Sequence, residues 1–158
     1  FVGGLLEHTL SVTKICDFYA GNYPIIHRDL LICAGMFHDI GKLEEISRFP
    51  QNDYTDEGQL LGHIIIGTEM ISEHIRAIPD FPVQLANELK HCILAHHGEL
   101  EYGSPKKPAL AEAMALNLAD NTDAKMETMK EIFKAAGTNM GWLGYNRFFE
   151  SNLRKTEV

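Results

Sequence analysis

Histidine and aspartate recur at five places within apolar, helix-forming sequence. The stretch GMFHDIGKLEE, residues 35–45, sets His38 beside Asp39 in a run that otherwise has the composition of a protein core. A lone buried carboxylate costs several kcal/mol. Two carboxylates among at least four imidazoles have one simple common explanation, which is that they surround one or two divalent cations. The residues in question are His8, His38, Asp39, His63, His96 and Asp120.

The donor types narrow the choice of metal. Histidine nitrogen combined with carboxylate oxygen is typical of sites for Mn, Fe, Co, Ni or Zn, whereas Mg or Ca would favour an all-oxygen set. Cys16, Cys33 and Cys92 lie away from these positions, which argues against a closed structural zinc site. Because their number is odd and their spacing matches no disulfide framework, we interpret them as core residues of a cytoplasmic protein.

Helical periodicity accounts for nearly all of the chain, so the sequence predicts an all-α fold. Residues 47–55 and 98–108 have the composition of loops, and Gly41 and Gly98 are interpreted as helix ends. Asp56 followed by Gln59 resembles a capping box. The aromatic tail, residues 137–158, is expected to dock on the bundle. The expected helices cover about 4–20, 29–38, 56–78, 82–97 and 109–136.

Helical spacing turns the ionisable residues inward. His8, for example, shares a face with Leu5 and Val12, and Asp120 shares one with Leu116. We therefore expect Asp39 and Asp120 both to be buried.

The bulk properties describe one ordinary globular domain. A length of 158 residues allows a single sizeable core. The net charge of −8 argues against a broad nucleic-acid surface on this segment. No run approaches the roughly 18–20 apolar residues of a membrane span. The first residues do not form a signal peptide, and we expect a domain cut from a longer protein.

The ordered set of His8, His38-Asp39 and Asp120, with HDIGK as its most recognisable piece, resembles the HD superfamily of metal-dependent phosphohydrolases. Five further stretches resemble the C-terminal HD domain of the YhaM family of 3′→5′ exoribonucleases. These stretches are GGLLEHTLSV, YTDEGQLLGHI, AHHGELEYGSPKKP, LADNTDAK and YNRFF. The resemblance implies a single HD domain over residues 1–158, built from five core helices plus short peripheral helices. It also implies an OB-fold domain that these 158 residues do not include.

The resemblance assigns roles to individual residues. His8, His38, Asp39 and Asp120 would hold a first metal, and Asp39 would bridge to a second. The second metal would be held by His63, His96 and His97. Trinuclear relatives place a glutamate where Gly4 stands here, so two ions are expected, with Mn²⁺ favoured, and a homo-oligomer is implied.

Adjacent residues on a helix point about 100° apart. His96 and His97 can therefore both reach one ion only near a helix end.

The implied reaction is attack of a two-metal-activated hydroxide on a phosphodiester. It would release nucleoside 5′-monophosphates from the 3′ end of single-stranded RNA or DNA. Asp39 and Lys42 are the expected catalytic residues. Lys42 resembles a lysine that contacts substrate phosphate in related enzymes, although a lysine in a last helical turn is also favoured by the helix dipole.

Other residues leave alternatives open. Lys106, Lys107 and Arg147 are candidate phosphate contacts or merely solvated cations. Tyr102 or Tyr145 could stack on a base or pack. Asp123 could orient a metal ligand or cap the helix. The remaining histidines, to which we assign structural or surface roles, are His27, His74 and His91.

Other functions use similar residues. A small-nucleotide phosphohydrolase, either a nucleotidase or a cyclic-nucleotide phosphodiesterase, would share the pocket chemistry. An HD-GYP enzyme would carry Gly-Tyr-Pro after its His-His pair, where this chain has HHGELEYGSPKKP. A di-iron oxygenase would use the same ligand types. A bundle that only binds a ligand would be expected to have lost some of these residues.

Overall fold

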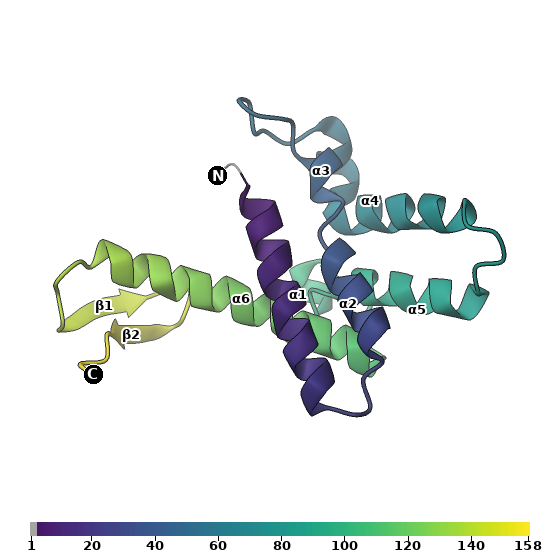
Figure 1. Ribbon diagram of the computed structural model, residues 1–158. Coiled ribbons are helices and arrows are strands. Elements are labelled where there is room, and N and C mark those ends of the chain that lie inside the picture. The colour runs from purple at the N-terminus through teal and green to yellow at the C-terminus, as the bar shows by residue number, and fades with distance from the viewer. Residues whose placement is uncertain (1–2) are drawn as a thin grey trace. The chain divides into compact units, whose positions relative to one another are not determined.

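The computed structural model describes residues 3–158, and most of them are helical (Figure 1). A short 3₁₀ helix, η1 (Leu100–Tyr102), precedes the last helix, and the strands β1 (Trp142–Asn146) and β2 (Ser151–Arg154) follow it. The all-α class is confirmed, with this one small hairpin added. The α-helices are α1 (Gly4–Asn22), α2 (Arg28–Phe37), α3 (Lys42–Glu45), α4 (Asp56–Arg76), α5 (Val83–Leu94) and α6 (Ala111–Ala135).

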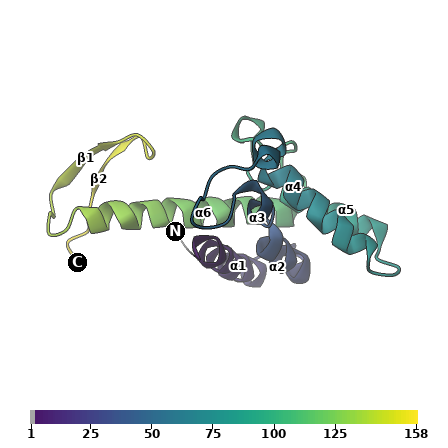
Figure 2. The same ribbon diagram turned by 90° about the horizontal axis from the view of Figure 1, so that it is seen from above.

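The chain divides into two compact units, Phe1–Asp123 and Ala124–Val158. The first unit contains α1 to α5 and the beginning of α6. Within it, α1 runs antiparallel to α2, and α4 runs antiparallel to α5 (Figures 1 and 2). Its core joins Val12 of α1, Leu31 of α2, Ile93 of α5 and Leu116 of α6, all fully buried. Burying one such side chain contributes about 1.5–3 kcal/mol.

The cysteines behave as core residues. Cys16 and Cys92 are buried and Cys33 is partly buried against the same core, and all three are free thiols. Among the described residues, no helix is both long enough and apolar enough to cross a membrane.

Several helix boundaries differ from those predicted. Helix α1 continues through Gly21 to Asn22. Thr55, rather than Asp56, caps α4, because its Oγ1 accepts a hydrogen bond from the Gly58 N–H at 2.9 Å. Helix α5 ends at Leu94, so the His96-His97 pair follows the helix instead of lying inside it.

Helix α4 contains a break that sequence periodicity did not predict. Gly62 has φ 75° and ψ 157°, outside the helical region, and a positive φ of this kind favours glycine. The second segment of α4 therefore begins at His63. Its first N–H donates to Glu45 Oε1 at 3.0 Å, so a side chain from α3 satisfies this new helix start.

The second unit pairs β1 with β2 in antiparallel register, with Trp142 opposite Arg154 and Asn146 opposite Ser151. A bulge falls at Gly144, whose φ is 97°. In the turn, Asn146 Oδ1 accepts hydrogen bonds from the backbone N–H groups of Phe148 and Phe149. The aromatic tail thus forms a hairpin, and its docking on the bundle stays a prediction.

Gly41 allows α3 to lie directly against α4. A Cβ at this position would lie 2.0 Å from the carbonyl oxygen of His63 and 2.6 Å from the backbone nitrogen of Gly67. The residue has helical dihedral angles, with φ −62° and ψ −20°. It therefore serves close backbone approach, and its interpretation as a simple helix end is wrong. Gly98 has φ 82° but lies three residues beyond the C-cap Ala95, so it is a turn residue that follows α5 rather than the helix end that was expected.

We expect Gly41→Ala to destabilise the fold by about 1–3 kcal/mol or more, because backbone atoms would have to move apart. Chemical denaturation followed by circular dichroism measures this change. Gly21→Ala is the matched control, since a Cβ there meets nothing within 4 Å. It should leave stability unchanged or raise it by up to about 1 kcal/mol. Equal effects of the two substitutions would contradict the proposed close approach.

Candidate metal centre

Five histidines converge in the first unit, and the Nδ1 atom of each is within hydrogen-bond distance of an oxygen atom. A histidine that donates its Nδ1 proton presents the lone pair of Nε2 on the other side of the ring. All five can therefore direct Nε2 into one shared site. The Nδ1 partners are Asp123 Oδ2 for His8 (2.6 Å), Gly35 O for His38 (2.8 Å), Glu45 Oε1 for His63 (3.3 Å), Ile93 O for His96 (2.6 Å) and Tyr102 O for His97 (2.8 Å).

Asp39 lies at the centre of these rings, with only 3% of its side chain exposed. Its Oδ2 atom is 3.6 Å from Nε2 of His8 and 3.4 Å from Nε2 of His38. Its Oδ1 atom is 3.4 Å from Nε2 of His63 and 3.5 Å from Nε2 of His96. One carboxylate thus faces two different sets of histidines, one with each oxygen.

Asp120 joins only one of these sets. Its Oδ1 lies 2.9 Å from Nε2 of His8 and 3.8 Å from Nε2 of His38. Its side chain is 19% exposed, so Asp120 is mostly but not fully buried. Asp123, one turn further along α6, is more deeply buried. The two carboxylates contact opposite nitrogens of the same ring, since Asp120 lies beside Nε2 of His8 and Asp123 beside Nδ1.

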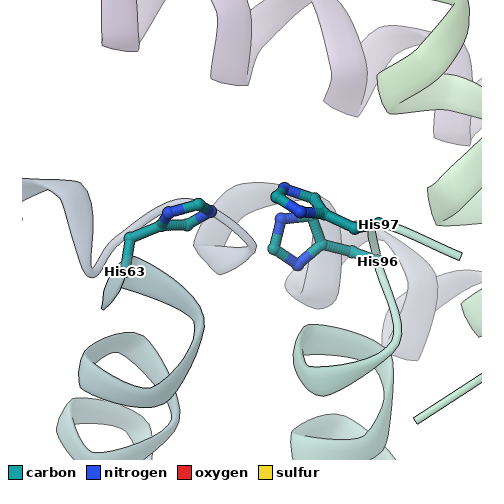
Figure 3. A group of neighbouring side chains, drawn as sticks. All are labelled: His63, His96 and His97. Carbon is teal, nitrogen blue, oxygen red and sulfur yellow. The ribbon is translucent and has the colours of Figure 1, made fainter. Parts of the chain in front are cut away.

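The ligand atoms form two groups. His8, His38 and Asp120 make one, and His63, His96 and His97 make the other, with the atoms of each group within 4.8 Å of one another. Figure 3 shows the second group, in which His63 extends from α4 toward the two rings that follow α5. Those two rings have centroids 4.4 Å apart. The neighbouring histidines converge because they lie beyond the helix end, as the sequence analysis required.

The residues fit divalent cations. Oδ1 of Asp39 and Nε2 of His63 and His96 are buried and have no hydrogen-bond partner among the described residues. Leaving such a group unsatisfied costs about 1–3 kcal/mol. Ligands ~2.1 Å from a common ion are themselves about 3.0–3.4 Å apart, close to the spacings around Asp39. The three orphaned atoms thus form a set that an ion would satisfy.

Electrostatics favour the ionised carboxylate. Burial would raise the pKa of Asp39, but its contacts with His38 and His96 hold that pKa well below its ordinary value. The hydrogen bond with Asp120 raises the pKa of His8 to about 9 despite burial. Burial lowers the pKa of His63 and of His97, so these two rings are readily neutral. A metal at His8 would have to displace a proton at neutral pH.

The candidate substrate residues have different positions. Lys42 Nζ lies 2.6 Å from Asp39 Oδ2 and is one-third exposed, so it is part of the centre. Lys107 pairs with Glu99 at 2.7 Å, and Lys106 is exposed. Arg147 is exposed on the second unit.

Two acidic residues complete the centre from behind. Of the two roles left open for Asp123, the geometry favours orientation of a ligand, because its carboxylate accepts from both His8 and Ser11. Glu45 accepts from the N–H and the ring of His63 and was missed altogether. Nothing in the sequence signals it, since the contact depends on the break at Gly62.

The other histidines have structural roles, as expected. His27 caps α2 through Nδ1, which accepts from the N–H of Leu30 at 3.3 Å. His74 bonds the carbonyl of Met70 within α4. His91 Nε2 accepts from the N–H of Ala109 at 2.9 Å.

We expect Asp123→Ala to weaken Mn²⁺ binding about 10- to 100-fold, because His8 would lose the acceptor that fixes its ring. Calorimetric titration of the metal-free chain with Mn²⁺ measures the affinity. Asp17→Ala removes an exposed carboxylate that pairs with Arg28 on the surface, and it serves as the control. Unchanged affinity in the Asp123 variant would show that its contact with His8 has no bearing on metal binding.

Comparison with known proteins agrees with this geometry. The family model described as HD domain matches residues 5–125. Proteins named 3′-5′ exoribonuclease YhaM from Bacillus velezensis and Bacillus subtilis are 43% and 42% identical to this chain over 131 residues. The matched residues are 82% of this chain, and the chain spans 41% of the length of these relatives. No solved structure gives a significant match.

The family model therefore covers the chain continuously from the second residue of α1 through α5 to the part of α6 that carries Asp120 and Asp123. The paired His38-Asp39, together with His8 and Asp120, lies within the matched residues. The chain belongs to the HD domain family.

Proposed function

We propose that this chain is the hydrolytic domain of a metal-dependent 3′→5′ exoribonuclease acting on single-stranded RNA. The observation that carries the proposal is the position of Asp39, whose two oxygens face two separate groups of ligand atoms. A carboxylate placed in this way is suited to bridge two ions. The 3′→5′ polarity and the RNA substrate are supported by the names of the Bacillus relatives.

The donor set supports two divalent ions. The first would be held by His8, His38 and Asp120, the second by His63, His96 and His97, with Asp39 shared between them. Mixed nitrogen and oxygen donors suit Mn, Fe, Co, Ni or Zn, and among these Mn²⁺ is the ion that we propose, on the family resemblance. When bound, such ions supply a nucleophile by lowering the pKa of water and polarise the phosphoryl oxygens.

The chain itself contributes charge and position. Lys42 reaches Asp39 at 2.6 Å and is partly exposed, so its ammonium group can turn toward a phosphate placed at the centre. A cation there neutralises charge that develops on the phosphoryl oxygens. Glu45 and Asp123 hold His63 and His8 in fixed orientations, so these rings need no rearrangement when a substrate arrives.

The wider setting of the domain is also a proposal. An OB-fold domain in the full-length protein would add to the RNA affinity of this chain, which agrees with the 41% share of the relatives that the chain spans. A cytoplasmic location is supported by the three free thiols. Assembly into a homo-oligomer is proposed on the family resemblance alone.

The direct test is incubation of the Mn²⁺-loaded chain with a 5′-labelled single-stranded RNA. We expect a ladder that shortens from the 3′ end and releases nucleoside 5′-monophosphates. Asp39→Ala should abolish it, because both groups of ligands lose their common carboxylate. Bis-p-nitrophenyl phosphate serves as a small phosphodiester in parallel. Hydrolysis of this ester without any attack on RNA would indicate a small-nucleotide phosphohydrolase, and hydrolysis of neither would refute the proposed function.

Replacing Lys42 separates substrate binding from metal binding. We expect Lys42→Ala to lower kcat on RNA about 10²- to 10³-fold, the usual cost of removing one group that stabilises transition-state charge. Its Mn²⁺ content, measured by atomic emission, should stay at the wild-type value. The control is Lys14, an exposed lysine on α1. Lys14→Ala should leave both kcat and the Mn²⁺ content unchanged. A loss of metal from the Lys42 variant would assign this lysine a structural role instead.

A further inference from the structure

A cavity of about 1040 Å³ opens directly beside the metal centre. His8, Asp39 and Lys42 line the end that belongs to the centre, and the start of α1 lines one side through Leu5 and Leu6. The remaining wall is the loop between α3 and α4. Its volume is at the upper end of the ~300–1,000 Å³ typical of ligand pockets. The cavity therefore suits an extended ligand whose reacting group lies at the metal centre.

The loop that forms this wall, residues 46–54, is ordered by its own backbone. Ile46 and Tyr54 form an antiparallel bridge at its base. The N–H of Ser47 donates to the carbonyl of Asp53 at 2.8 Å, and the N–H of Asp53 donates to Ser47 Oγ at 3.0 Å. These bonds close the base of the loop, so the backbone that carries its tip is ordered before any ligand binds.

Two side chains at the tip of this loop make no visible contribution to the stability of the fold. Arg48 is exposed and makes no ion pair or hydrogen bond among the described residues. Phe49 exposes 71% of its surface, although an aromatic ring normally gains by burial. Both line the cavity. Glu44 lies on the same wall, so the charge there is not uniformly positive.

We propose that the 46–54 loop binds the single-stranded RNA just upstream of the scissile phosphate. Phe49 stacks on a base and Arg48 contacts a backbone phosphate. This inference rests on the proposed function and adds to it the subsite that holds the RNA strand. It differs from the sequence-based expectation, which placed substrate contacts at Lys106, Lys107 and Arg147.

Charge complementarity favours RNA over an apolar partner on this wall. The chain has 22 acidic and 14 basic residues, so an unpaired arginine close to Lys42 and the metal centre is a local exception to the overall charge. An exposed aromatic ring beside an unpaired cation is the usual combination for a single strand, because every base has a face that can stack and every linkage carries a phosphate.

The test measures RNA binding by the whole chain, using fluorescence anisotropy of a 5′-fluorescein-labelled oligouridylate. EDTA keeps the RNA intact, and the titration is repeated over a range of salt concentrations. Arg48→Ala and Phe49→Ala are compared with two controls remote from the cavity. Phe18→Ala removes a ring that is 64% exposed on α1. Arg76→Ala removes an exposed arginine at the far end of α4.

The two variants should differ in kind. Phe49→Ala should raise Kd about 5- to 150-fold, because base stacking is lost, with no change in salt dependence. Arg48→Ala should raise Kd and reduce the slope of log Kd against log salt by about 0.7, the contribution of one phosphate contact on a single strand. Phe49→Trp and Arg48→Lys should retain most of the affinity. Phe18→Ala and Arg76→Ala should bind as the wild type does.

Several results would overturn the inference. These are a wild-type chain that does not bind the RNA, variants of the loop that bind as the wild type does, and an equal loss in the remote controls. If the cavity binds another protein domain instead of RNA, the loop variants should bind RNA as the wild type does. The proposed function fails separately. If Arg48→Ala and Phe49→Ala weaken binding but the Mn²⁺-loaded wild type does not shorten RNA, the loop is an RNA site and the exonuclease proposal is wrong.

Discussion

A carboxylate buried among four imidazoles is the constraint around which the first unit is built. Asp39 is almost wholly removed from solvent, and an uncompensated charge in that position costs several kcal/mol. Lys42 compensates one oxygen directly. The other oxygen faces buried nitrogens that have no hydrogen-bond partner of their own. A divalent cation would satisfy both the charge of the centre and these atoms without partners.

Most of the candidate ligands reach this point because helices end or break beside it, whereas His8 and Asp120 lie inside α1 and α6. His38 follows the last residue of α2, the His96-His97 pair follows α5, and His63 begins the second segment of α4 after Gly62. A residue inside a regular helix projects in a direction fixed by its neighbours, whereas a residue at an end is free of that limit. The same ends leave backbone groups that need partners. Glu45 satisfies one of them and orients a ligand ring at the same time.

The cavity continues the same arrangement outward from the metal centre. The short helix α3 is held against α4 at Gly41, and the ordered 46–54 loop extends from it. The segment that carries Asp39 and Lys42 thus leads directly to Arg48 and Phe49. In the proposed function, chemistry and substrate contact would lie on one short segment, so little intervening chain would separate them. An acidic domain would in this way present a local site for a polyanion.

The sequence by itself determined the helical class and which histidine and aspartate side chains converge at one place. Periodicity reports which side of a helix is buried, and residue type reports which atoms bind metals. Neither property indicates where a helix breaks. The break at Gly62 and the contact of Glu45 with His63 therefore could not be predicted from the sequence. The sequence also did not indicate the deeper burial of Asp123, the β hairpin of the tail or the position of Arg48. These features depend on contacts between segments far apart in the chain, and only the tertiary structure decided them.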